Sequence, residues 1–99
     1  MPKTSKFDAA RYLDDPETIA AYLSEALETG DSELICAALD TIARAKGMSS
    51  VAEATGLGRT SLYKALSGNA KPEFETVQKV IGSFGLKLVA EPVKGGRAA

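Results

Sequence analysis

The stretch from Met48 to Gly68, MSSVAEATGLGRTSLYKALSG, constrains the fold more than any other part of the sequence. Two short segments with apolar residues at helical spacing flank a break at Gly56-Leu57-Gly58. Glycine adopts the positive φ that a tight turn requires at little steric cost, and Leu57 can fill the angle between two helices. The pattern predicts two short helices joined by a tight turn, which is a helix-turn-helix.

Two longer helices are predicted before this motif. Asp15-Pro16-Glu17 indicates the start of the first, because aspartate accepts hydrogen bonds from free amides and proline suits the first helical position. Gly30 ends this helix, and the second begins at Asp31 or Ser32 and ends at Gly47. The 3.6-residue period gives the first helix an inward face of Ile19, Tyr22, Leu23, Ala26 and Leu27, and the second one of Leu34, Ile35, Ala38, Leu39, Ile42 and Ala45.

The remaining helices follow the same rules. Within the motif, Ser50 and Glu53 have the spacing of a capping box, and Ser49 is the alternative cap. A fifth helix is predicted from about Glu73 to Phe84, because Gly85 follows the last periodic residue. Its inward residues are Phe74, Val77, Val80, Ile81 and Phe84.

The segment Leu86 to Ala90 is apolar, alternates in part, and predicts a short strand. A strand needs a partner, which is either the region around Phe7 or a second copy of the chain. Residues 7–13 fit an extended piece or a turn of helix, and residues 1–6 and 92–99 are predicted to be flexible. With 99 residues, the chain suits one all-α domain (1–99) of five helices, with a helical core over 16–84 and this strand at 86–90.

Cysteine and histidine usage limits the chemistry of the chain. Cys36 is the only cysteine and there is no histidine, so neither an internal disulfide nor a recognisable zinc set is expected. Cys36 lies among apolar residues and is interpreted as a small core side chain. No run approaches the roughly 20 apolar residues of a membrane span, and no leader is apparent. The prediction is a cytoplasmic protein without a cofactor.

The formal net charge of -1 hides an uneven distribution along the chain. Residues 1–41 carry three basic and nine acidic side chains, a net charge of -6, whereas residues 42–99 carry nine basic and four acidic ones, a net charge of +5. This asymmetry indicates that the second half faces nucleic acid and that the first faces another partner, such as a basic protein. The alternative is that both halves are simply solvated.

The second helix of the motif has the side chains that base reading requires. Leu62, Ala65 and Leu66 fall on one side at 100° per residue, which leaves polar residues on the other. Arginine and lysine read guanine in the major groove, and threonine meets the thymine methyl. The predicted base contacts are Arg59, Thr60, Ser61 and Lys64, and the predicted DNA-backbone contacts are Ser49, Ser50, Ser67, Asn69 and Lys71.

Two alternatives apply to these residues. The same polar face fits an ordinary solvated helix, and Tyr63 at its flank is more typical of a packed ring than of a groove contact. The helix-turn-helix region has few basic residues, so a monomer would bind DNA weakly.

A homodimer with two recognition helices about one DNA turn apart is therefore predicted.

The segments FDAARYLDDPE, YLSEALETGD, ALDTIARAKGMSSVAEATGLGRTSLYKALSG and ETVQKVIGSFGLKL, between about Phe7 and Val89, resemble the addiction-module antidote proteins. These are HigA-like antitoxins with a helix-turn-helix of the lambda repressor and Cro type. The resemblance implies a lambda repressor-like DNA-binding fold. It also implies direct neutralisation of a small basic toxin of the RelE/ParE class, and repression of the chain's own operon by dimers.

By the same resemblance, individual positions acquire expected roles. Arg59, Thr60, Ser61 and Lys64 match the base-reading positions of the family, and Ser49, Ser67 and Asn69 match the backbone-contacting ones. Met48 stands where such repressors often carry glutamine, which removes an expected phosphate contact. The toxin would be attracted to the acidic half, where Glu17, Glu25 and Glu28 are the predicted contacts.

Two other classes of function are alternatives to the antitoxin. A stand-alone Cro-type repressor without a toxin has the same motif. An enzyme is not expected, since there is no histidine, no Gly-rich phosphate loop and no evident carboxylate pair. Ser61 and Lys64 have the Ser-x-x-Lys spacing of some hydrolases, but the companion motifs are missing.

Overall fold

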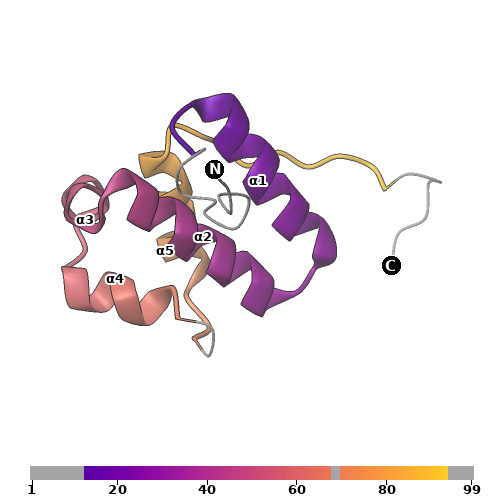
Figure 1. The fold of residues 1–99 in the computed structure, drawn as a ribbon. Coiled ribbons are helices and arrows are strands. Elements are labelled where there is room, and N and C mark those ends of the chain that lie inside the picture. Colours follow the sequence, from indigo (N-terminus) through magenta and orange to yellow (C-terminus); the bar gives the residue numbers. More distant parts are fainter. Residues whose placement is uncertain (1–12, 68–69, 94–99) are drawn as a thin grey trace, which may run out of the picture.

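The structure is a computed structural model that describes residues 13–67 and 70–93. The described residues form five α-helices and no strand, which confirms the all-helical class: α1 (Pro16–Thr29), α2 (Ser32–Lys46), α3 (Met48–Thr55), α4 (Arg59–Ala65) and α5 (Phe74–Ser83). In Figure 1, α2 crosses the middle of the molecule, with α1 on one side of it and α3 and α4 on the other. The predictions for residues 1–12, Asn69 and 94–99 lie outside the described residues.

The starts of the two long helices are set by aspartate caps. The Asp15 carboxylate accepts hydrogen bonds from the Thr18 amide at 2.7 Å and from the Thr18 hydroxyl at 3.0 Å. Asp31 accepts from the Glu33 amide at 2.9 Å, so it is Asp31 and not Ser32 that caps α2. Gly30, with a φ of 68°, closes α1 as predicted. These boundaries follow from local side-chain chemistry alone.

The start of α3 differs from the prediction. It begins at Met48, directly after Gly47, and has no side-chain cap, so the proposed Ser50–Glu53 capping box is wrong. The reason is that Gly47, with a φ of 101°, makes the whole connection between α2 and α3 in one residue. The two serines after Met48 are thereby already within the first turn of the helix.

One hydrophobic cluster joins all five helices. Its central members are the fully buried Ile19 of α1, Leu39 and Ile42 of α2, Leu62 of α4 and Val80 of α5. The rest are Leu13, Leu23, Ala38, Ala43, Met48, Val51, Ala52, Leu66, Ile81 and Phe84. Because burial of a large aliphatic side chain stabilises the fold by about 1.5–3 kcal/mol, this cluster fixes which face of each helix points inward.

Two residues assigned to inward faces are exposed instead. Leu34 is 50% exposed and Phe74 is 65% exposed, so both assignments are wrong. Each lies in the first turn of its helix. The apolar periodicity extends to this turn, but no neighbouring helix covers the side chain there. The other predicted inward positions of these helices are buried or half-buried.

The strand predicted over 86–90 is absent. The Leu86 amide donates to the Ile81 carbonyl at 3.3 Å, and Leu86 packs half-buried against the core. Beyond it, residues 87–93 are exposed and extend from the end of α5. A strand requires a hydrogen-bonded partner, and none pairs with this segment among the described residues. No helix of the described part is long and apolar enough to cross a membrane.

Candidate nucleic-acid interface

A tight turn between α3 and α4 sets the angle of the second helix. Gly56 adopts the left-handed conformation with a φ of 78°, and its amide donates to the Ala52 carbonyl. The Thr55 hydroxyl is buried, donates to the Val51 carbonyl at 2.8 Å, and accepts from the Leu57 amide at 3.3 Å. Thr55 thus stabilises both the end of α3 and the turn.

The two sides of α4 are those that the sequence predicts. Leu62 and, just after the helix, Leu66 are buried in the core. The four residues predicted to read bases are exposed together on the remaining surface: Arg59, Thr60, Ser61 and Lys64. Burial of the apolar side of α4 therefore leaves these four hydrogen-bonding side chains, called the α4 row below, facing solvent. Their contact with DNA stays a prediction.

The predicted backbone-contacting residues lie at helix ends. Ser49 and Ser50 are exposed in the first turn of α3, where amides have no intrahelical acceptor, since the first such bond comes from Val51. Ser67 is exposed, but its hydroxyl donates to the Lys64 carbonyl at 3.1 Å and is thereby occupied. Lys71 is exposed in the loop before α5.

A cluster that sequence reasoning missed lies beside this row. The half-buried ring of Tyr63 has the guanidinium carbon of Arg44 5.2 Å from its centroid and that of Arg59 5.9 Å from it. Arg59 also donates to the Tyr63 hydroxyl at 3.4 Å. Arg44 pairs with Asp40 at 2.9 Å, and that hydrogen bond raises the pKa of Arg44. No periodicity rule brings Arg44 and Tyr63 together, because they belong to different helices.

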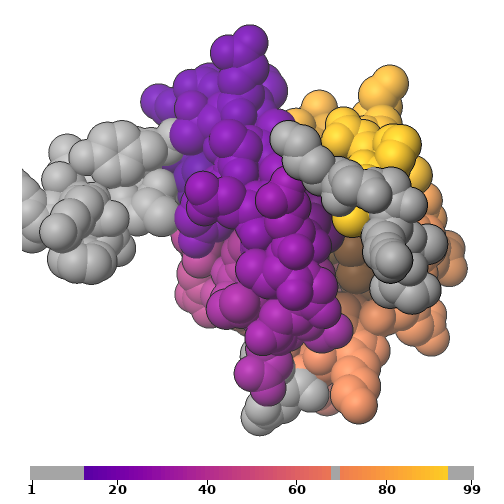
Figure 2. Space-filling model, turned by 90° about the vertical axis from the view of Figure 1, so that its right-hand side faces the viewer, coloured from indigo at the N-terminus to yellow at the C-terminus, as the bar shows by residue number. Residues whose placement is uncertain are grey.

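The charge asymmetry is also present among the residues that the structure describes. Residues 13–43 carry eight acidic side chains and no basic one, whereas the described residues from 44 to 93 carry seven basic and four acidic ones. Figure 2 views the molecule from the side where α1 and α2 form most of the described surface. Glu17, Glu25 and Glu28 are all exposed on α1. The carboxylates of α1 and the α4 row therefore belong to different parts of the molecule, with α2 between α1 and α4 (Figure 1), whereas Asp40 of α2 lies near α4 through its pair with Arg44.

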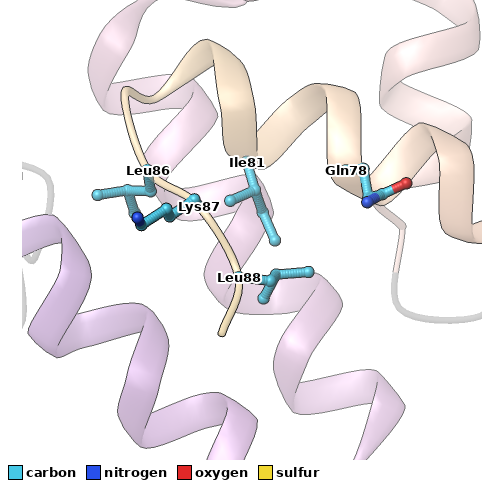
Figure 3. Close-up of a pocket in the computed structure, with 5 residues that line it drawn as sticks. All are labelled: Gln78, Ile81, Leu86, Lys87 and Leu88. Atoms are coloured by element: carbon cyan, nitrogen blue, oxygen red, sulfur yellow. The ribbon is translucent and has the colours of Figure 1, made fainter. Parts of the chain in front are cut away.

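A shallow groove of about 250 Å³ lies between α5 and the segment after it. It is lined by Gln78, Ile81, Leu86, Lys87 and Leu88, and Figure 3 shows Ile81 and Leu88 next to each other in it. Lys87 is the one titratable side chain of this lining, which provides no acid–base pair. This groove resembles a contact surface more than a catalytic site.

The nucleophilic and metal-binding chemistry of the described part is limited. Cys36 is buried, as predicted, and burial raises the pKa of its thiol, which disfavours the reactive thiolate. No group of three or more carboxylate or thiol side chains within residues 13–67 and 70–93 could hold a metal ion.

Comparison with known proteins identifies the family. Residues 3–92 match the family described as Probable addiction module antidote protein. The chain belongs to this family. It is also 47% identical, over 82 residues, to an uncharacterised protein of Haemophilus influenzae (strain ATCC 51907 / DSM 11121 / KW20 / Rd), covering 83% of this chain and 84% of the relative. No solved structure matches. Membership of the antidote family suggests a non-enzymatic antitoxin with a toxin partner of some kind.

Proposed function

We propose that the chain is a HigA-like antitoxin with a lambda repressor-type helix-turn-helix. It neutralises a small basic toxin of the RelE/ParE class by direct binding in the cytoplasm, and it represses its own operon as a homodimer. The single observation that carries the DNA-binding part is the α4 row, in which Arg59, Thr60, Ser61 and Lys64 are exposed while Leu62 is buried beneath them. The proposal treats residues 1–99 as one domain.

The α3–α4 pair has the features that a DNA-binding helix-turn-helix requires. A short second helix held by its apolar side can present its polar side to the major groove, where bidentate arginine contacts discriminate bases by about 1–3 kcal/mol. Free amides at the start of α3 and the side chains of Ser49, Ser50, Asn69 and Lys71 are suited to phosphates, and Ser67 would join them by exchanging its hydrogen bond to the Lys64 carbonyl for one to a phosphate. The basic excess of residues 44–93 adds attraction that does not depend on sequence.

The DNA proposal is tested by fluorescence anisotropy with the duplex that lies upstream of the chain's own coding sequence. We expect Arg59→Ala and Lys64→Ala each to weaken specific binding by roughly 5- to 150-fold, as loss of a bidentate base contact implies. Lys79→Ala on α5 is the matched control, because Lys79 is exposed and pairs only loosely with Glu75, at 3.7 Å. If both α4 variants bind as tightly as the control at moderate salt, the recognition helix is wrongly assigned.

The acidic surface supports the toxin part of the proposal. Eight carboxylates without a basic residue over 13–43 create a negative field that attracts a basic protein and fixes its approach. Glu17, Glu25 and Glu28 are the proposed contacts on α1. Leu34, half exposed at the start of α2, adds an apolar contact next to the acidic residues Asp31 and Glu33.

The partner test uses the basic protein encoded beside the chain, if one is present. Reversal of Glu17, Glu25 and Glu28 to lysine should raise the dissociation constant of the complex, most strongly at low salt, because exposed charge pairs are screened. Reversal of three acidic residues of the other half (Glu73, Glu75 and Glu91) changes the net charge equally and serves as the control. Equal losses in both triple variants would mean that only total charge matters and that α1 is not the contact surface.

The proposal of a homodimer is based on the position of the exposed apolar side chains. Four of the five large exposed ones lie in the last part of the described chain: Phe74, Leu88, Val89 and Val93. The groove between Ile81 and Leu88 (Figure 3) lies in the same region. Pairing of two such segments across a two-fold axis would supply the partner that the predicted strand lacks. Sedimentation equilibrium of the chain and of a Leu88→Glu variant tests this, because the variant should shift the equilibrium toward monomer.

A stand-alone Cro-type repressor is the second candidate. It accounts for the α4 row equally well, but it leaves the acidic surface of residues 13–43 without a role. The absence of a neighbouring gene for a basic protein, together with specific DNA binding, would favour this candidate.

A further inference from the structure

Tyr63 contacts two arginines, one on α2 and one on its own helix, α4. Its half-buried ring packs against the core from α4, Arg44 reaches it from the last turn of α2, and Arg59 reaches it from one turn earlier in α4. Positions four apart lie on the same face of a helix, so the contact between Arg59 and Tyr63 follows directly from their spacing. The contact with Arg44 requires the packing of α2 near α4.

The two arginines are not equivalent. Arg44 is neutralised by Asp40, with the guanidinium nitrogen Nε 2.9 Å from the carboxylate. Among the described residues Arg59 has no ion-pair partner; its side chain donates a hydrogen bond to the Tyr63 hydroxyl at 3.4 Å and lies 5.9 Å from the ring centroid. The charge of Arg44 is therefore already balanced by Asp40, whereas the charge of Arg59 remains available to an anionic or polar ligand.

An exposed arginine otherwise samples many rotamers, and ordering it on binding costs conformational entropy. A rigid aromatic face restricts these rotamers before the ligand arrives, since a guanidinium within about 6 Å of the centroid is attracted to the ring. The packing of the half-buried Tyr63 against the core, and its cation–π contact with Arg44 of α2, fix the position of the ring. The restriction therefore acts on Arg59 alone among the four residues of the α4 row.

We propose that Tyr63 is a positioning residue that pre-orders the Arg59 guanidinium for base reading, with the Asp40–Arg44 pair fixing the ring. The inference rests on the proposed DNA-binding function and adds the residue that sets the strength of one base preference. Tyr63 itself needs no contact with DNA in this arrangement, which agrees with its half-buried ring.

The experiment starts from selection of duplexes out of a randomised library by the full-length chain, so that no operator has to be known. Affinity for the selected site is then measured for the parent, Arg59→Ala, Tyr63→Leu and the double variant. We expect Tyr63→Leu to weaken specific binding by about two- to fivefold, the range of an exposed cation–π contact. It should relax the same base position that Arg59→Ala relaxes, and leave binding to unrelated duplex unchanged.

The double-mutant cycle separates positioning from a general structural role. If Tyr63 acts through Arg59, the double variant binds as Arg59→Ala does. If Tyr63→Leu weakens binding equally in both backgrounds, the ring merely supports α4 and the inference is wrong. Should Tyr63→Leu not fold by circular dichroism, Tyr63→Met also removes the aromatic face, fills the same space with an unbranched apolar side chain, and runs the same cycle.

The failure of each proposal has its own result. A parent chain that selects no sequence removes the proposed DNA-binding function, and the inference falls with it. A parent chain that selects a sequence, with Tyr63→Leu binding it as tightly as the parent does, overturns the inference alone.

Discussion

Replacement of Gly56 by alanine isolates the conformational demand of the α3–α4 turn. Gly56 has a φ of 78°, and a Cβ built on it meets no atom within 4 Å, so the cost of Gly56→Ala is conformational and not steric. A left-handed backbone costs an L-residue about 1–2 kcal/mol, and the stiffer unfolded chain returns about 0.4–1 kcal/mol. We expect a net loss of about 1 kcal/mol, which lowers the Tm by roughly 4–8 °C in a domain of this size.

Gly58, two residues later in the same turn, provides the matched control. A Cβ there also meets nothing within 4 Å, but the φ of -71° and ψ of 155° suit any residue. Gly58→Ala loses a few tenths of a kcal/mol as a poorer N-cap and gains a similar amount from the unfolded chain, so its stability should stay within about 0.5 kcal/mol of the parent.

Urea unfolding followed by circular dichroism measures both variants against the parent, with equal m-values as the check on two-state behaviour. The reasoning requires Gly56→Ala to be the less stable of the two by about 1 kcal/mol. Equal midpoints for the two variants would refute the assignment of the turn to a left-handed glycine.

Three other measurements address the core, the first cap and the thiol. Leu39→Ala should cost about 2–5 kcal/mol in urea unfolding because Leu39 is fully buried, whereas Leu34→Ala, at a half-exposed site, should cost less than about 0.5 kcal/mol. Hydrogen bonds from Thr18 lower the pKa of Asp15, so its capping contribution is present above the unfolded pKa and is lost as the pH falls through the folded one. Asp15→Ala should therefore lower the Tm at pH 7, and this difference from the parent should vanish in strong acid. Cys36 should react slowly with a thiol reagent in the native chain and rapidly in urea, because burial raises the pKa of its thiol.

Features that depend on local chemistry could be predicted from the sequence. Asp15 and Asp31 cap helices because their side chains reach amides two or three residues away, and Gly30 ends α1 for an equally local reason. The two sides of α4 follow from the helical period, which puts Leu62 inward and Lys64 outward.

Features that depend on neighbouring segments could not be predicted. Periodicity assigns Leu34 and Phe74 to inward faces but does not say where the covering helices end, and both are exposed. The strand at 86–90 needed a partner that the described chain does not provide. The contact of Arg44 with Tyr63 depends on α3 holding α4 close enough to α2 for the arginine side chain to reach the ring, which no spacing in the sequence encodes.

The electrostatic influence of the α1 carboxylates on the exposed side of α4 depends on the salt concentration. The longest dimension is 40 Å, and Figure 1 places α1 and α4 on opposite sides of α2. The Debye length is about 8 Å at 0.15 M ionic strength and about 30 Å at 0.01 M. At physiological salt the carboxylates of α1 are therefore largely screened from α4, because the intervening helix is itself about 10 Å thick. In dilute buffer the two become coupled, so that neutralising the carboxylates of α1 strengthens the attraction of any polyanion to α4.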